Sequence, residues 1–110
     1  MQLIIDSSFD EQNNNWLVVM KGEIDLFNSN DMKSKLLALL EDKPANLIIN
    51  CENLDYIDST ALGALVNVSK NTKGYGFDIF LKNVKPNIEK LFRITNLDKV
   101  FKLEGDPGEQ

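Results

Sequence analysis

The sequence predicts an α/β fold in which helices pack against a small mixed, mainly parallel β-sheet. Short apolar segments rich in β-branched residues alternate along the chain with segments whose apolar residues recur at helical spacing. Only the first two strands are separated by a short polar turn; the later ones are separated by helices that cross over between parallel strands. Strands and helices in this order predict a sheet covered by helices.

The first two strands are expected to pair as a hairpin. Residues 3–5 are a short apolar run that predicts an edge strand, and residues 10–15 are a polar turn. Residues 16–20 (Trp-Leu-Val-Val-Met) have the aromatic and β-branched character of a second strand. That strand leads into residues 22–25 (Gly-Glu-Ile-Asp).

The first helix is predicted to begin within residues 28–31, which offer several N-cap candidates and an acid for the first turn. Lys43 and Pro44 end it. Residues 46–51 follow as a short apolar strand, predicted to be buried on both faces, with Cys51 as a small core residue. The apolar residues at helical spacing are Met32, Leu36, Leu39 and Leu40.

After residues 54–57, the second helix is predicted to begin at residues 58–60 and to run to about Thr72. Gly74 and Gly76 stop it. The next strand is expected at residues 77–81.

Pro86 is predicted to open the third helix, because proline suits the first helical position. Residues 100–103 indicate a last short strand, and residues 105–110 a frayed tail. The core positions expected on the third helix are Ile88, Leu91, Phe92 and Ile94.

The composition excludes several classes of protein. A chain of 110 residues is one domain, here residues 1–110, and its net charge of −5 without a Lys/Arg run argues against a direct nucleic-acid partner. No segment is long and apolar enough for a membrane span. The single cysteine excludes an internal disulfide, which fits the cytoplasm. The absence of histidine removes the commonest general base and metal ligand, so we expect no enzyme activity, no cofactor and no metal.

The working groups of such a sheet are expected where strands end and helices begin. Ser59 stands at such a junction, and two interpretations of it are open. In the first, its hydroxyl is a helix cap, which contributes about 1 kcal/mol; in the second, it accepts a phosphoryl group. Phosphorylation would add roughly −1.5 to −2 charges beside Asp58, and near Glu23 and Asp25 if the two strand ends are neighbours. We expect such a charge to break an interface rather than to order a loop.

The carboxylates allow an enzyme interpretation that the rest of the sequence does not support. Asp25 and Asp58 suit an acid/base pair or a magnesium site. No phosphate-binding loop and no Gly-x-Ser-x-Gly elbow accompanies them, so catalysis is not favoured.

The second helix has more apolar breadth than a surface helix needs. Ala61, Leu65 and Val68 form one stripe, and Leu62 and Val66 lie partly on another. Deeper burial and a docking patch beside Ser59 explain the second stripe equally well.

Residues 56–63 (Tyr-Ile-Asp-Ser-Thr-Ala-Leu-Gly) resemble the signature of the anti-sigma factor antagonists of the STAS domain family. Residues 22–25 are similar to the family's upstream Gly-Glu-Leu/Ile-Asp, and residues 47–51 and 91–101 resemble family segments in order and spacing. The resemblance covers essentially the whole chain.

The resemblance implies a STAS fold and a partner-switching function. Family members bind an anti-sigma factor that is also a serine kinase, and this binding releases the sigma factor. Phosphorylation of the antagonist by that kinase blocks binding, and a phosphoserine phosphatase restores the active form. The partners implied for this chain are therefore an anti-sigma factor serine kinase and a phosphoserine phosphatase.

By motif match, Ser59 takes the phosphorylated position, and Asp25 and Glu23 take family positions near the site and in the partner-facing turn. The chain departs from the family pattern at Ala61, where glycine is usual; its methyl group is expected close to the path of the kinase. The matched residues around Ser59 are Asp58, Thr60, Leu62 and Gly63.

Two other functions stay open. One is a STAS scaffold subunit of a larger sensory complex. The other is a receiver-like domain phosphorylated on Asp58, although Asp6 and Lys82 match the acidic pair and late lysine of receivers poorly. For an antagonist that exchanges partners we expect a monomer.

Overall fold

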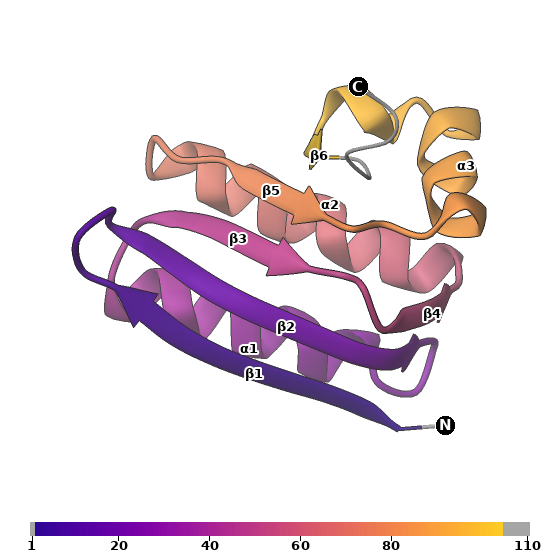
Figure 1. The fold of residues 1–110 in the computed structure, drawn as a ribbon, viewed down its shortest axis with the longest axis horizontal. Helices are drawn as coiled ribbons and strands as arrows, with labels where there is room; N and C mark the ends of the chain where they lie inside the picture. Colours follow the sequence, from indigo (N-terminus) through magenta and orange to yellow (C-terminus); the bar gives the residue numbers. More distant parts are fainter. Residues whose placement is uncertain (1, 105–110) are drawn as a thin grey trace.

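The computed structural model describes residues 2–104 and contains a six-stranded sheet with three α-helices (Figure 1). The predicted frayed tail, residues 105–110, lies outside the described residues. The elements in chain order are β1 (Leu3–Asp10), β2 (Asn15–Ile24), α1 (Ser29–Asp42), β3 (Asn46–Asn50), β4 (Leu54–Ile57), α2 (Ser59–Gly74), β5 (Ile79–Lys82), α3 (Pro86–Ile94), the 3-10 helix η1 (Leu97–Lys99) and β6 (Lys102–Glu104).

The sheet is mixed and mainly parallel, as predicted. Its order is β1-β2-β3-β5-β6, with only β1 and β2 antiparallel. Strand β2 is long enough for two parallel neighbours: its first half pairs with β3 and its last residues pair with β4. The carboxyl ends of β2 and β4 therefore lie next to each other (Figure 1).

The hairpin is longer than predicted, since β1 reaches Asp10 and β2 reaches Ile24. Residues 6–8 (Asp-Ser-Ser) are polar because they are exposed on an edge strand, so an apolar run could not reveal them. Burial of β3 on both faces is wrong: Leu47 and Ile49 are buried, but Ile48 is only half-buried. Helices α1 and α2 cover one face of the sheet and leave the other face of β3 uncovered by them.

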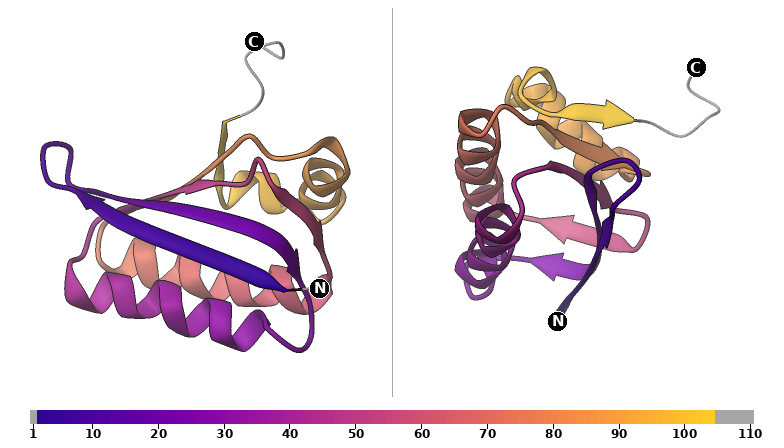
Figure 2. Two further views of the ribbon diagram at one scale, coloured as in Figure 1. Left: turned by 60° about the horizontal axis from the view of Figure 1, so that its bottom comes forward. Right: turned by 90° about the vertical axis from the view of Figure 1, so that its left-hand side faces the viewer.

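Helices α1 and α2 lie side by side against that face (Figure 2). Alternating β2 side chains meet helical side chains three or four residues apart, and burying each large apolar side chain contributes about 1.5–3 kcal/mol. Members of this core are Trp16, Val18 and Met20 from β2, Met32, Leu36 and Leu40 from α1, and Ala61, Leu65 and Val68 from α2.

Helix α3 lies apart from this pair and contacts β4 and η1. Ile88 and Phe92 are buried as predicted, and the Phe92 ring meets Phe101 edge-on at 5.4 Å. Ile94 is 67% exposed, so its prediction as a core residue is wrong; it is the last residue of α3 and stands two residues after the buried Phe92, on a different side of the helix. The last strand is Lys102–Glu104, because Val100 and Phe101 belong to the turn that closes η1.

Within residues 2–104, no helix is both long and apolar enough to cross a membrane.

Candidate functional site

The structure brings the two predicted junctions together. Ile24 and Ile57, the last residues of β2 and β4, are direct partners in the sheet, and the Asp58 N–H donates to the Ile24 carbonyl at 3.2 Å. The turn that starts at Asp25 therefore lies beside the start of α2, which carries Ser59.

Asp58, rather than Ser59, is the N-cap of α2. Its backbone is extended, and its Oδ1 accepts hydrogen bonds from the Ala61 N–H at 3.0 Å and from the Thr60 hydroxyl at 2.5 Å. The interpretation of Ser59 as the cap is therefore wrong, because the Asp58 carboxylate, one residue earlier, already accepts the Ala61 N–H.

The same hydrogen bonds set the charge of Asp58. The Thr60 hydroxyl, followed by the Ala61 N–H, holds the pKa of the Asp58 carboxyl below its ordinary value of 3.8. Asp58 is therefore ionised at neutral pH, directly before Ser59, and it complements the positive end of the helix.

Ser59 is the first residue of α2 and is exposed. Its hydroxyl takes part in none of the hydrogen bonds of the described residues, whereas the Thr60 hydroxyl is committed to Asp58. Among the described residues, the Ser59 hydroxyl is therefore exposed without a hydrogen-bond partner, unlike the adjacent Thr60 hydroxyl.

Asp25 is committed to the turn between β2 and α1. Its Oδ1 accepts from the Phe27 N–H at 2.9 Å and from the Asn28 N–H at 3.3 Å. The Asn28 side chain in turn accepts a hydrogen bond from the Asp25 N–H at 2.9 Å through its Oδ1 and donates one to the Glu23 carbonyl at 2.9 Å through its Nδ2. These hydrogen bonds make Asp25 a turn-forming residue. The structure also contains no group of three or more His, Cys, Asp or Glu side chains within residues 2–104 that could hold a metal ion.

The turn presents two apolar residues that sequence reasoning missed. Leu26 is 65% exposed and Phe27 is 90% exposed. Leu26 also lines a shallow pocket of about 330 Å³ with Thr60 and Gly63 from the start of α2. The signal in the sequence was an apolar pair between Asp25 and Asn28, where turn residues are expected to be polar.

The second apolar stripe of α2 belongs to the core. Leu62 is 6% exposed and Val66 is half-buried against the core, so deeper burial accounts for this stripe better than a docking patch does. Ala61 is fully buried, so its methyl group faces the core and not the approach to Ser59. Gly63 is exposed with open space around it.

Cys51 is buried directly after β3, and burial raises the pKa of its thiol to about 12. An un-ionised thiol is a poor nucleophile, which agrees with its prediction as a core residue.

Fold and site define a small α/β domain in which two strand–helix junctions, β2–α1 and β4–α2, lie side by side and expose Ser59, Leu26 and Phe27. Its sequence matches the STAS domain model over residues 7–109. The anti-sigma-B factor antagonist of Bacillus subtilis (strain 168) is 35% identical over 92 residues, which are 83% of this chain and 84% of that protein. The anti-sigma-B factor antagonist of Staphylococcus aureus (strain NCTC 8325 / PS 47) is 30% identical over 80 residues, 73% of this chain and 74% of that protein.

Solved structures share the fold. The anti-sigma factor antagonist SpoIIAA in its unphosphorylated form superimposes with a TM-score of 0.72 at 17% identity, over 96% of this chain and 92% of that one. The phosphorylated form of the Bacillus protein gives a TM-score of 0.72 at 18% identity, over 96% and 94% of the two chains. This chain belongs to the STAS domain family.

Proposed function

We propose that this chain is an anti-sigma factor antagonist that binds an anti-sigma factor through the surface around Ser59. The observation that carries the proposal is the free, exposed Ser59 hydroxyl at the start of α2, with the exposed Leu26 and Phe27 in the turn that follows the neighbouring strand β2. We call Leu26, Phe27, Ser59, Thr60 and Gly63 the Ser59 face.

The apolar part of this face suits protein binding. A phenylalanine with 90% of its surface in water costs free energy in the free protein, and a partner that covers it recovers this cost. The hydrogen bonds of Asp25 and Asn28 fix the turn that carries Phe27, so little conformational entropy is lost on binding.

Phosphorylation of Ser59 would switch binding off. The phosphoryl group would bring roughly −1.5 to −2 charges to a site that already holds the ionised Asp58 and, at the end of the neighbouring strand, Asp25. The helix N-terminus tolerates that charge in the free protein. A partner that covers Phe27 would have to remove water from the charged phosphoryl group, and this desolvation cost weakens binding.

The relatives support the partners of this switch. Two of them are named anti-sigma-B factor antagonists, and SpoIIAA has been solved in unphosphorylated and phosphorylated forms. We assign to this chain an anti-sigma factor that is also the serine kinase, a phosphoserine phosphatase that reverses it, and the cytoplasm as its compartment. The chain itself acts by binding and needs no cofactor.

The first experiment incubates the chain with its candidate anti-sigma kinase, ATP and magnesium, followed by intact mass and fragment analysis. We expect one phosphate on Ser59, absent in Ser59→Ala and present in Ser34→Ala, a change at an exposed serine in the middle of α1. Phosphate on any other residue, or none with any candidate kinase, contradicts the proposal.

The same experiment separates the two other functions. Phosphate on Asp58 would indicate a receiver-like domain, and an acyl phosphate is lost in acid whereas phosphoserine is retained. The commitment of Asp58 to capping α2 disfavours that outcome. Neither phosphate nor kinase binding, with large partners co-purifying, would indicate a scaffold subunit.

A further inference from the structure

Strand β4, which leads to Ser59, contains a β-bulge. Its pairing with β2 shifts by one residue: Leu54 pairs with Gly22, but Tyr56 pairs with the next residue, Glu23. Asp55 is the extra residue and has no partner on β2. The bulge breaks the alternation of the strand, so that two exposed residues, Asp55 and Tyr56, stand between the buried Leu54 and Ile57.

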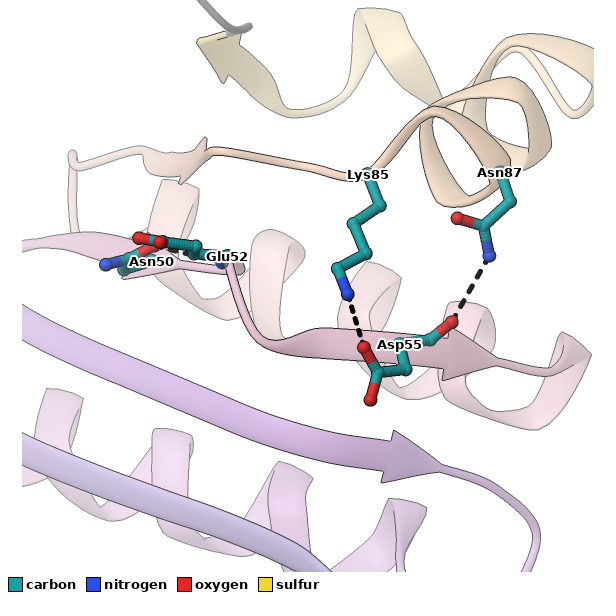
Figure 3. Close-up of polar contacts among 5 residues, drawn as sticks. All are labelled: Asn50, Glu52, Asp55, Lys85 and Asn87. Carbon is teal, nitrogen blue, oxygen red and sulfur yellow. Dashed lines mark hydrogen bonds and ion pairs between the residues drawn. The ribbon is translucent and has the colours of Figure 1, made fainter.

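Two residues at the start of α3 contact Asp55, which has no partner on β2. Within residues 2–104, β4 pairs with β2 alone, so its other edge has no strand. The Lys85 ammonium forms an ion pair with the Asp55 carboxylate, and the Asn87 side-chain amide donates to the Asp55 carbonyl at 3.2 Å (Figure 3). We call Asp55, Lys85 and Asn87 the bulge clamp.

The turn before the bulge is held as well. The Asn50 side-chain oxygen accepts from the Glu52 N–H at 3.0 Å and from the Asn83 side-chain amide at 3.1 Å. Figure 3 shows Asn50 and Glu52 in the segment that leads to Asp55. Two hydrogen bonds therefore tie this part of the chain to the region around the start of α3: Asn83, before the helix, donates to Asn50 at the end of β3, and Asn87, in its first turn, donates to Asp55 in β4.

The bulge determines the direction in which the chain enters α2. A slip of one residue in β4 would turn Ile57 out of the core and remove Asp58 from the Ile24 carbonyl. The cap of α2 and the exposure of Ser59 both depend on that register. Contacts that hold Asp55 in place therefore hold the register of β4 at the point where its pairing with β2 shifts, three residues before Asp58.

We propose that the bulge clamp is a positioning device for Ser59: Lys85 and Asn87 hold the bulge so that the Asp58 cap and the Ser59 hydroxyl keep their orientation. Its value for switching rests on the proposed function. The start of α3 is thereby mechanically connected to the Ser59 face, although neither Lys85 nor Asn87 belongs to that face.

The clamp lies at the surface, with 39% of the Lys85 side chain and 49% of the Asp55 side chain exposed. Exposed ion pairs contribute little to global stability. Removing the clamp should therefore loosen the junction locally without unfolding the domain, which separates a positioning role from a general structural one.

The test compares Lys85→Met/Asn87→Ala with the parent protein, using amide hydrogen exchange of the isolated chain. We expect protection at the hydrogen-bonded amides of Asp58, Ala61 and Leu62 to fall roughly fivefold, while the urea midpoint of global unfolding stays the same. Lys85→Arg should retain the protection. Lys90→Met, an exposed lysine on the same helix, is the matched control and should change nothing.

A second arm needs no variant. Raising sodium chloride to about 1 M shortens the screening length to roughly 3 Å and should lower the same three protection factors in the parent but not in the double variant. Unchanged protection in the double variant, or an equal loss in Lys90→Met, would overturn the proposal.

Phosphorylation provides the readout that concerns function. With the anti-sigma kinase, the double variant should be phosphorylated several-fold more slowly than the parent, and Lys85→Arg should restore the rate. Equal rates despite lost protection would overturn the positioning role. If the kinase fails to phosphorylate the parent itself, the proposed function fails, and the exchange measurement still decides whether the clamp holds the junction.

Discussion

At the scale of single residues, three neighbouring side chains have separate tasks. Asp58 caps α2, Thr60 reinforces that cap through its hydroxyl, and Ser59 between them is left free. The motif in the sequence identified the three residues but not this division. A serine and an aspartate are both good caps, and only the backbone geometry shows that α2 begins one residue after Asp58.

The Asp58 cap should depend on pH. Its pKa is lowered on folding, so the ionised carboxylate stabilises the domain above pH 3.8 and this contribution is lost as pH falls through the folded pKa. Asp58→Ala should lower the urea midpoint at pH 7. The difference in urea midpoint between this variant and the parent should shrink as the pH falls below 3.8. Asp58→Asn, which keeps an oxygen for the Ala61 N–H, is the matched control for charge. A difference between Asp58→Ala and the parent that stays constant with pH would contradict the assignment.

Phe27 should be an anchor for the partner. Phe27→Ser is expected to weaken binding of the anti-sigma factor about tenfold or more, without lowering the urea midpoint, because the ring is almost fully exposed in the free protein. Titration calorimetry measures the affinity. Tyr75→Ser, an exposed aromatic residue at the other end of α2, should leave it unchanged. Equal losses in the two variants would place the interface elsewhere.

At the scale of elements, pattern predicted helices better than strands. All three α-helices start within a residue or two of their predicted positions, because caps, prolines and helical spacing mark them. The strands of the hairpin extend beyond their apolar parts, since pairing on an edge strand tolerates polar residues such as Asp6. Nothing in residues 54–57 marks the bulge at Asp55, whose side chain and carbonyl are contacted by Lys85 and Asn87, about thirty residues further along the chain.

Two glycines of these elements should respond oppositely to alanine. Gly22 in β2 has a φ of +108°, and a Cβ there would lie 2.0 Å from the Gln2 carbonyl oxygen. Gly22→Ala should therefore lower the free energy of unfolding by about 1–3 kcal/mol. Gly63→Ala meets open space within α2 and should raise it by about 0.5–1 kcal/mol. Urea denaturation measures both, and changes of equal sign would contradict this assignment of the backbone.

At the scale of the whole molecule, the sequence predicts the fold class and two strand–helix junctions that could carry the site, but their meeting follows only from the pairing of β2 with β4. The sequence does not predict what each junction exposes. Helical spacing allowed either burial or exposure of Leu62, which is buried, whereas Leu26 and Phe27 belong to no predicted element and are exposed. Exposure depends on how α1 and α2 share one face of the sheet, which is a property of tertiary packing and not of any one segment.

We predict that the free protein is a monomer. Apart from Leu26 and Phe27, no two of the exposed large apolar residues within residues 2–104 are adjacent in sequence, and scattered single residues are ordinary on a monomer surface. Sedimentation velocity over a wide concentration range should show one species of the monomer mass, 12.5 kDa. A dimer that persists on dilution would contradict this.

The central claim is that charge on Ser59 switches partner binding at an otherwise unchanged surface. The most direct measurement compares the affinity of the anti-sigma factor for the unmodified chain and for the chain phosphorylated on Ser59. We predict a loss of about 100-fold or more, roughly 2.7 kcal/mol, with the fold retained. Equal affinity of the two forms would contradict the switch, even if Ser59 is phosphorylated.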